Sequence, residues 1–144
     1  MTAMRAVPIP PHLAADALPT MQRFLGPVCS RPMADITLDD LAGIVAREEG
    51  MLALVVDGND QVVAAGVTQI RDYEDGRRVC WLLAMGGGRA REWRHTLQDI
   101  EDGARRAGCA SVEFVGRKGW ARLLSDYRTE PCERGVHFSK SLRH

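Results

Sequence analysis

The sequence predicts an α/β (α+β) fold with a mixed, mostly antiparallel central sheet and helices on both faces. Three apolar runs separated by turn residues predict consecutive antiparallel strands. A further apolar run follows an amphipathic helical pattern, which predicts a crossover to a parallel strand. The chain has 144 residues, of which 45% are hydrophobic. That length suits one buried core, so we expect a single domain over residues 1–144.

The first part of the chain predicts an extended lead-in and a helix. Residues 1–10 contain two prolines and no periodic pattern, so we expect them to be extended. Apolar residues recur at helical spacing from Ala14 to Leu25, and Pro19 predicts a kink or a restart within that pattern. The pair Gly26-Pro27 is expected to end this helix.

A second short helix is predicted to begin after Thr37. Threonine is a good N-cap residue, and Asp39 and Asp40 follow in the first turn, where acidic side chains are favourable. We expect Gly50 to close the segment as a glycine just past the helix end.

Three strands are expected next, with the glycine Gly66 in the middle one indicating a bulge or a close backbone approach. The turn sequences Asp57-Gly58-Asn59-Asp60 and Asp75-Gly76 separate them. The predicted strands are Met51 to Val56, Gln61 to Ile70 and Arg78 to Met85.

The segment after the third strand predicts a helix and a parallel strand. Its apolar positions share one helical face, from Trp93 to Ala107, and its charged residues are expected on the other face. Those charged residues are Glu101, Asp102, Arg105 and Arg106. A strand at Val112 to Val115, one or two helical turns from Trp120 to Tyr127, and a last strand at Val136 to Ser139 complete the pattern.

A triple glycine, Gly86 to Gly88, lies between the third strand and the long helix. Backbone N–H groups can converge on an anion where a glycine loop meets a helix N-terminus, so this unit is typical of a phosphate site. A plain tight turn explains the same glycines equally well. If a ligand approaches closely, we expect a bulky residue at Gly87 to block the ligand and to leave the fold intact.

The order of elements resembles that of the GNAT N-acetyltransferase superfamily over roughly Ala14 to Leu142. The sequence is also similar to small GNAT-like proteins of bacteriophages and prophages. The residues that carry this narrower resemblance are Thr68, Asp72-Tyr73, Gly86-Gly87, Trp93, Gly108-Cys109, Gly116-Arg117-x-Gly119-Trp120 and Tyr127.

The resemblance implies acetyl-CoA or CoA as the cofactor. It implies that the pantetheine arm runs along Leu83, Ala84 and Met85, and that Gly86, Gly87, Gly88, Arg89 and Ala90 hold the pyrophosphate. Arg89 and Arg91 would then neutralise the phosphates. Arg117 and Lys118 would reach the same phosphates or the adenine, and a solvated loop is the alternative explanation for both.

The sequence departs from the family pattern at three points. The loop Met85 to Arg91 does not match [Gln/Arg]-x-x-Gly-x-[Gly/Ala] in register. Leu123 or Leu124 stands where many relatives carry a tyrosine acid, and Arg78 to Met85 contains no carboxylate to act as base. Tyr127 could act from a shifted position, but a packed tyrosine is the more frequent case. The catalytic residues therefore stay unassigned.

Other candidate side chains have ordinary structural explanations. Trp81, Trp93 and Trp120 fall on apolar faces and are expected in the core. Glu113 alternates with Val112 and Phe114, so it faces either solvent or a cleft. The histidines show no spacing for a metal site, and the four cysteines show no Cys-x-x-Cys pair.

Charge and composition limit the classes of binding partner that we expect. The 19 basic and 19 acidic residues cancel, so no overall field favours nucleic acid or a membrane surface. No apolar stretch is long enough for a membrane span, and we expect a cytoplasmic protein with reduced thiols.

Two functions fit these expectations. One is an acyl-CoA-dependent N-acyltransferase, or a CoA-binding relative, with a small-molecule or protein amine as its unknown acceptor. The alternative is a catalytically silent GNAT-like interaction protein in phage assembly or host takeover. A homodimer, or a phage or host protein partner, is compatible with either.

Overall fold

The computed structural model describes residues 4–32, 34–88 and 90–142, and seven strands in this part of the chain form one sheet. The strand order is β1-β2-β3-β4-β5-β7-β6, and only the β4–β5 pair is parallel. The predicted mixed, mostly antiparallel sheet is therefore confirmed. The strands are β1 (Arg5–Pro8), β2 (Met51–Val56), β3 (Val62–Asp72), β4 (Arg78–Gly86), β5 (Ser111–Gly116), β6 (Arg128–Cys132) and β7 (Gly135–Ser141).

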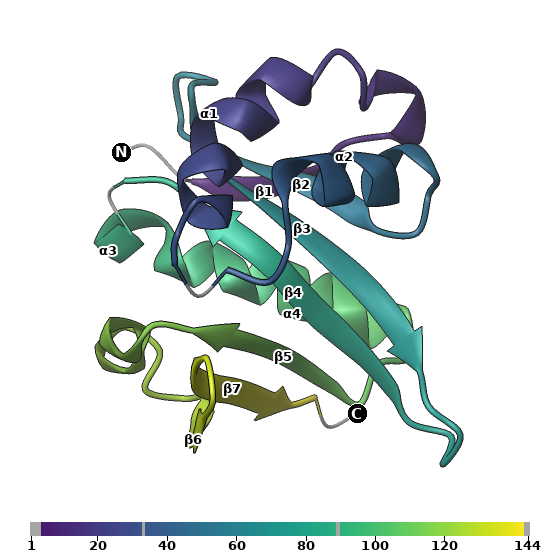
Figure 1. Cartoon of the computed structure of the whole chain (residues 1–144), viewed down its shortest axis with the longest axis vertical. Helices are drawn as coiled ribbons and strands as arrows, with labels where there is room; N and C mark the ends of the chain where they lie inside the picture. Colours follow the sequence, from purple (N-terminus) through teal and green to yellow (C-terminus); the bar gives the residue numbers. More distant parts are fainter. Residues whose placement is uncertain (1–3, 33, 89, 143–144) are drawn as a thin grey trace.

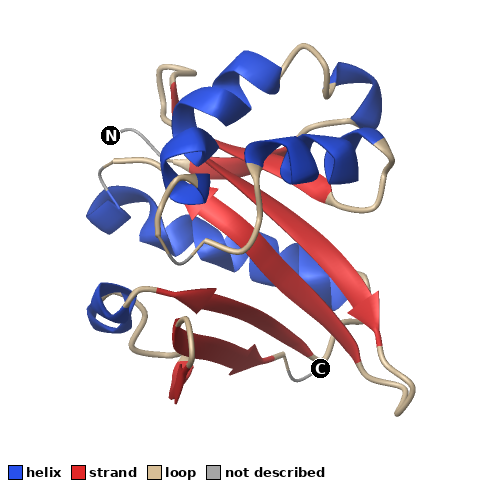
Figure 2. Ribbon diagram, viewed as in Figure 1, coloured by secondary structure: helices blue, strands red, loops and turns tan. Residues whose placement is uncertain are grey.

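Helices cover both faces of the sheet, as expected (Figures 1 and 2). On one face, α1 (Leu18–Cys29) and α2 (Leu38–Ala46) bury Met21, Leu25 and Leu41 against β2, β3 and β4. On the other face, α4 packs on β4, β5 and β7 around Phe114 and Phe138. The remaining helical segments are η1 (Pro11–Leu13), α3 (Ala90–Trp93), η2 (Arg94–Thr96), α4 (Leu97–Arg106) and η3 (Lys118–Arg122).

The described part of the lead-in, residues 4–10, contains a strand of the sheet that the sequence pattern did not reveal. Residues 5–8 pair with β2, and the Ala6 N–H donates to Asp99 Oδ2 on α4 at 3.0 Å. An edge strand has a partner on one side only, so it tolerates the proline at its end.

Both N-terminal helices differ from prediction at their C-terminal ends. Helix α1 restarts at Leu18 with Pro19 in its first turn, but it continues through Pro27 to Cys29, so the predicted end at Gly26-Pro27 is wrong. Helix α2 has the expected cap, because Thr37 and Asp40 form a reciprocal capping box.

Gly50 does not close α2 as predicted. The helix ends at Ala46, and Glu48 takes the positive φ, 59°. A Cβ at Gly50 would lie 2.6 Å from Ile44 Cγ2 and 2.8 Å from the Thr68 carbonyl oxygen, so this glycine serves packing.

The long helix predicted after the glycines is broken into α3, η2 and α4. At the break, Trp93 is buried and Thr96 Oγ1 donates to the Trp93 carbonyl at 2.5 Å. Strand β6 was not predicted. All five residues of β6 are exposed, so no apolar alternation announces this strand.

Candidate functional site

Strands β4 and β5 separate soon after they begin to pair. Their parallel ladder consists of Val79–Ser111, Cys80–Val112 and Trp81–Glu113, while β4 continues to Gly86 and β5 to Gly116. Beyond Trp81, β4 pairs only with β3 in the described residues, and β5 beyond Glu113 pairs only with β7. The facing edges of the two strands therefore carry backbone N–H and C=O groups with no strand partner.

A β-bulge lies on β4 where the strands part. Val67 of β3 pairs with Ala84, and Thr68 pairs with Leu82, which leaves Leu83 as the extra residue. A bulge bends its strand and increases the local twist. The bulge at Leu83 lies just beyond the last β4–β5 pair, where β4 turns away from β5.

A cleft of about 180 Å³ occupies the space between the diverging strands. Three of the residues expected on the cofactor arm, Leu83, Ala84 and Met85, line it, and so does Arg117. The α1–α2 connection contributes Arg31, Asp35 and Ile36, and the far wall is formed by Phe114, Val115, Gly116, Trp120, Leu124 and Arg134.

The first two glycines of the loop are required by the fold itself. A Cβ at Gly86 would collide with the Phe24 carbonyl oxygen of α1. Gly87 has a φ of 148°, and its Cβ would lie 2.5 Å from the Val63 carbonyl oxygen. The expectation that a bulky residue at Gly87 leaves the fold intact is therefore wrong.

The third glycine, Gly88, has open space where a Cβ would be. Nothing lies within 4 Å of a Cβ built on Gly88, whose carbonyl accepts from Trp93 Nε1 at 2.7 Å. Arg89, expected at the pyrophosphate, lies outside the described residues. Ala90 is half-buried and Arg91 exposed in the four-residue α3.

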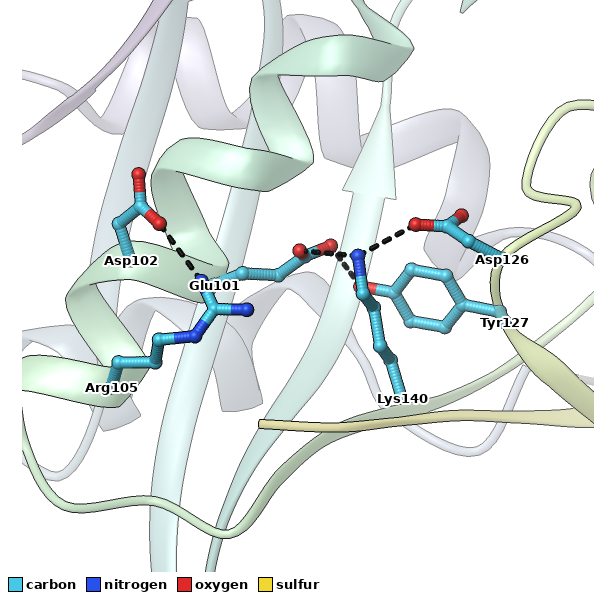
Figure 3. Close-up of polar contacts among 6 residues, drawn as sticks. All are labelled: Glu101, Asp102, Arg105, Asp126, Tyr127 and Lys140. Atoms are coloured by element: carbon cyan, nitrogen blue, oxygen red, sulfur yellow. Dashed lines mark hydrogen bonds and ion pairs between the residues drawn. The ribbon is translucent and has the colours of Figure 1, made fainter. Parts of the chain in front are cut away.

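Tyr127 is a packed residue with a fixed partner, as its sequence context suggested. Its hydroxyl donates to Glu101 Oε2 at 2.9 Å (Figure 3). Its ring packs on Phe114. Burial first, and then the nearby Glu101 charge, raise the pKa of Tyr127 far above its usual value. The hydroxyl is not among the groups that line the cleft. Leu124, at a position expected for the acid, does line the cleft, but its side chain has no acidic proton to donate.

Glu101 was predicted on the charged outer face of α4, and that prediction is wrong. It is only 3% exposed and points inward, whereas Asp102 and Arg105 form an ion pair along the outside of the helix (Figure 3). Lys140 Nζ donates to Glu101 Oε1 at 2.8 Å and to Asp126 Oδ2 at 2.6 Å. The buried carboxylate is thus held by a phenol and an ammonium from two other segments.

A carboxylate–imidazole pair joins β5 to β7 near the cleft, and neither of its residues is among those that line the cleft. Glu113 Oε1 is 2.8 Å from His137 Nε2, and Ser111 Oγ donates to Glu113 Oε2 at 2.7 Å. Glu113 and Val115 share one face of β5 because strand residues alternate, and Val115 lines the cleft. Sequence reasoning left Glu113 undecided and gave His137 no partner. Only the register of β5 with β7 brings them together.

The three tryptophans have different surroundings. Trp93 is fully buried, as expected. Trp120 is half-buried: it packs on Trp93 with ring centroids 5.5 Å apart and also lines the cleft. Trp81, expected in the core, is half-buried beside the pair just described, stacked on His137 at 5.8 Å with its Nε1 donating to Tyr73.

The charged lining of the cleft is mainly basic. Arg31, Arg117 and Arg134 face one acidic residue, Asp35, which forms an ion pair with Arg134. Burial first, and then the charge of Arg117, lower the pKa of Arg31. Cys29 also lines the cleft, but burial, followed by the charge of Asp40, raises the pKa of its thiol and disfavours a nucleophilic thiolate.

Residues 4–32, 34–88 and 90–142 contain neither a membrane-spanning helix nor a metal-binding cluster. No helix there has the length and apolar character needed to cross a membrane. No group of three or more His, Cys, Asp or Glu side chains in those ranges could hold a metal ion.

No protein-family model matches the sequence, and no curated protein matches it. Solved structures do match. The NatC complex bound to Gag peptide and CoA contains a chain with a TM-score of 0.70 and 10% identity, over 97% of this chain and 99% of that one. A GNAT family acetyltransferase from Brucella melitensis in complex with acetyl-CoA matches with a TM-score of 0.67 and 12% identity, over 99% of this chain and 90% of that one. The ribosomal-protein-S18-alanine N-acetyltransferase from Escherichia coli matches with a TM-score of 0.65 and 13% identity, over 100% of this chain and 96% of that one.

These likenesses show that the chain has the fold of the GNAT acetyltransferases. The identities are low, so the likeness concerns the fold.

Proposed function

We propose that this protein is an N-acyltransferase that takes its acyl group from acetyl-CoA or a related acyl-CoA. The observation that carries the proposal is the parting of β4 and β5 at a bulge, which leaves an unpaired strand edge along a cleft. Relatives in fold were solved with CoA or acetyl-CoA bound, which supports the same reading.

The residues at this edge fit an acyl-CoA. Backbone groups of Leu83, Ala84 and Met85 would bind the pantetheine arm, and the open backbone at Gly88 with Ala90 and Arg91 would take the pyrophosphate. Gly86 and Gly87 shape the loop by packing on α1 and β3. A bound acyl-CoA would supply an activated thioester carbonyl. N–H groups on the β4 edge would stabilise negative charge on that carbonyl oxygen.

The pair Glu113–His137 would accept the proton that the attacking amine must lose. Glu113 lies two residues along β5 from Val115, a backbone span of about 6.8 Å, so water molecules would carry the proton from the cleft to the pair. This pair takes the place of the carboxylate that β4 lacks. Because Tyr127 is bound to Glu101 outside the cleft, it plays no part in this proton path.

Binding is the first test. CoA and acetyl-CoA should each raise the unfolding temperature, because a ligand at 100 times its Kd stabilises the folded protein by about 2.7 kcal/mol.

Activity is the second test. Acetyl transfer to a panel of small amines should be measurable. It should be lost in Val115→Trp, which fills the cleft from a strand position that is 46% exposed. Ile70→Trp, at a β3 position 47% exposed and outside this cleft, is the matched control.

The proton path is tested separately. Glu113→Gln should lower turnover at neutral pH by roughly 10²–10⁴-fold, with recovery at high pH where the amine is already neutral. Glu130→Gln, at an exposed position of β6, should have no such effect. Equal pH profiles for Glu113→Gln and the unchanged protein would remove the pair from the mechanism.

A catalytically silent interaction protein is the second candidate. The leucines at the acid position and the packing roles of Gly86 and Gly87 favour it. Failure of both CoA and acetyl-CoA to stabilise the protein at millimolar concentration would decide for this alternative. The phage or host partner suggested by the sequence resemblance would then be the first to seek.

A further inference from the structure

We propose that Arg31 and Arg117 form a subsite for an anionic group on the acceptor, so that the preferred substrate is a small amine carrying a carboxylate or a phosphate. This inference rests on the proposed acyltransferase function and names the class of acceptor for that site. Both arginines line the cleft between β4 and β5.

The two arginines come from distant segments. Arg31 follows α1, and Arg117 follows β5, so only the fold brings them to the same cleft. Neither guanidinium has a hydrogen-bond or ion-pair partner within residues 4–32, 34–88 and 90–142. Arg31 is half-buried, and the charge of Arg117 is close enough to help lower its pKa.

Arg31 is half-buried and Arg117 is exposed. Their like charges repel one another, and a counter-ion bound by both removes the repulsion. A guanidinium binds a carboxylate or a phosphate through parallel N–H···O bonds, which gives both strength and orientation. The third arginine of the cleft, Arg134, is already neutralised by Asp35. The uncompensated positive charge therefore belongs to Arg31 and Arg117.

The positions of the two arginines indicate an acceptor. They line the same cleft as Leu83, Ala84 and Met85, the β4 residues proposed for the pantetheine arm, but they follow α1 and β5. The sequence placed Arg117 at the phosphates or the adenine of the cofactor. The cleft that Arg117 shares with Arg31 contains none of Gly86–Gly88, Ala90 or Arg91, the described residues of the loop proposed for the pyrophosphate.

The test compares amines that differ only in charge. β-Alanine is paired with β-alaninamide, and phosphoethanolamine with ethanolamine, with acetyl-CoA as the donor. We expect kcat/KM to favour the anionic member of at least one pair by about tenfold or more, as charge-assisted hydrogen bonds allow. The pair with the larger ratio shows whether the natural group is a carboxylate or a phosphate. Arg31→Gln and Arg117→Gln should each reduce that ratio toward one, and Arg106→Gln, an exposed arginine of α4 outside this cleft, should preserve it.

A second readout separates this inference from the proposed function. Phosphoethanolamine or β-alanine, without acetyl-CoA, should raise the unfolding temperature of the protein and of Arg106→Gln but not of Arg31→Gln. If acetyl transfer is absent while this stabilisation is seen, the anion subsite stands and the proposed function fails. If amines are acetylated with no preference for the anionic member, the inference is overturned and the function stands. A raised KM for acetyl-CoA in Arg31→Gln and Arg117→Gln, with the acceptor ratio unchanged, would assign the arginines to the cofactor and also overturn it.

Discussion

The hydroxyl of Tyr127 and the carboxylate of Glu101 lie 2.9 Å apart, and the two side chains are 5% and 3% exposed. The bond joins the segment after η3 to the middle of α4. Because the phenol is buried and faces a carboxylate, its proton is held in the core and not offered to the cleft.

Tyr127→Phe should therefore affect stability more than catalysis. Loss of a hydrogen bond to a buried charged group costs about 1.5–3 kcal/mol, which urea unfolding would measure. Tyr73→Phe, at an exposed tyrosine whose hydroxyl accepts from Trp81, should cost less than about 1 kcal/mol. If acetyl transfer collapses in Tyr127→Phe while stability is unchanged, Tyr127 is the acid after all.

Removal of Lys140 should be one of the more damaging single changes. Lys140→Met leaves Glu101 buried with one donor fewer, and breaking a buried ion pair from one side costs about 3–5 kcal/mol. We expect the lower end of that range because the Lys140 side chain is 25% exposed. In the double variant Lys140→Met/Glu101→Gln the charge is gone, so stability should partly return. A double variant as unstable as the sum of both single changes would contradict this coupling.

The pair Asp126–Lys140 predicts how stability changes with pH. The hydrogen bond from Lys140 lowers the pKa of Asp126, so this contribution is complete above the ordinary aspartate pKa of about 3.9 and is lost as pH falls through the lowered value. Burial lowers the pKa of Lys140, but its bonds to Asp126 and Glu101 outweigh burial and raise it. Its contribution is complete below about pH 10.4 and is lost as pH rises through the raised value. Urea unfolding of Asp126→Asn across this range should show a shallower decline on the acid side than the unchanged protein.

The glycine loop offers a matched comparison. Gly87→Ala should destabilise by more than about 1 kcal/mol, because φ is positive and the added methyl would collide with β3. Gly88→Ala should be within about 0.5 kcal/mol of the unchanged protein, because its Cβ would meet open space. Thermal and urea unfolding would measure both. Equal costs at the two positions would mean that the loop does not pack as described.

The tryptophan pair tests which indole supports the core. Trp93→Ala should cost about 3–5 kcal/mol, as for a fully buried aromatic side chain. Trp120→Ala should cost less than about 3 kcal/mol, because Trp120 is half-buried and borders the cleft. A Trp120 side chain fully buried in the core, as the sequence predicted, would have cost about 3–5 kcal/mol on truncation. A larger loss for Trp120 than for Trp93 in urea unfolding would reverse these roles.

Local patterns in the sequence were enough to predict the elements that have strong signals. The valine-rich runs predicted β2 and β3, the crossover predicted the parallel pair β4–β5, and Thr37 with Asp40 predicted the start of α2. Strands β1 and β6 gave no such signal, because one is a short edge strand ending in proline and the other is wholly exposed.

The site was harder to predict because its key contacts join distant residues. Leu83 to Met85 followed from the resemblance in element order, and they do line the cleft. Glu113 meets His137 only through the β5–β7 register. Arg31 lines the same cleft as Arg117 only through the placement of α1. Glu101 looked like a surface residue of α4, because periodicity cannot show that Tyr127 and Lys140 supply partners for a buried charge.

The early end of the β4–β5 ladder also defines what shape of molecule the sheet can accept. A backbone edge that should have bound a neighbouring strand demands hydrogen-bond acceptors and donors at the repeat of an extended peptide. A linear chain with amide groups at that spacing would complete the sheet as a substitute strand, whereas a compact or branched molecule would leave the edge unmet. Under the proposed function, the interrupted ladder would act as a template that selects its ligand by backbone-like geometry.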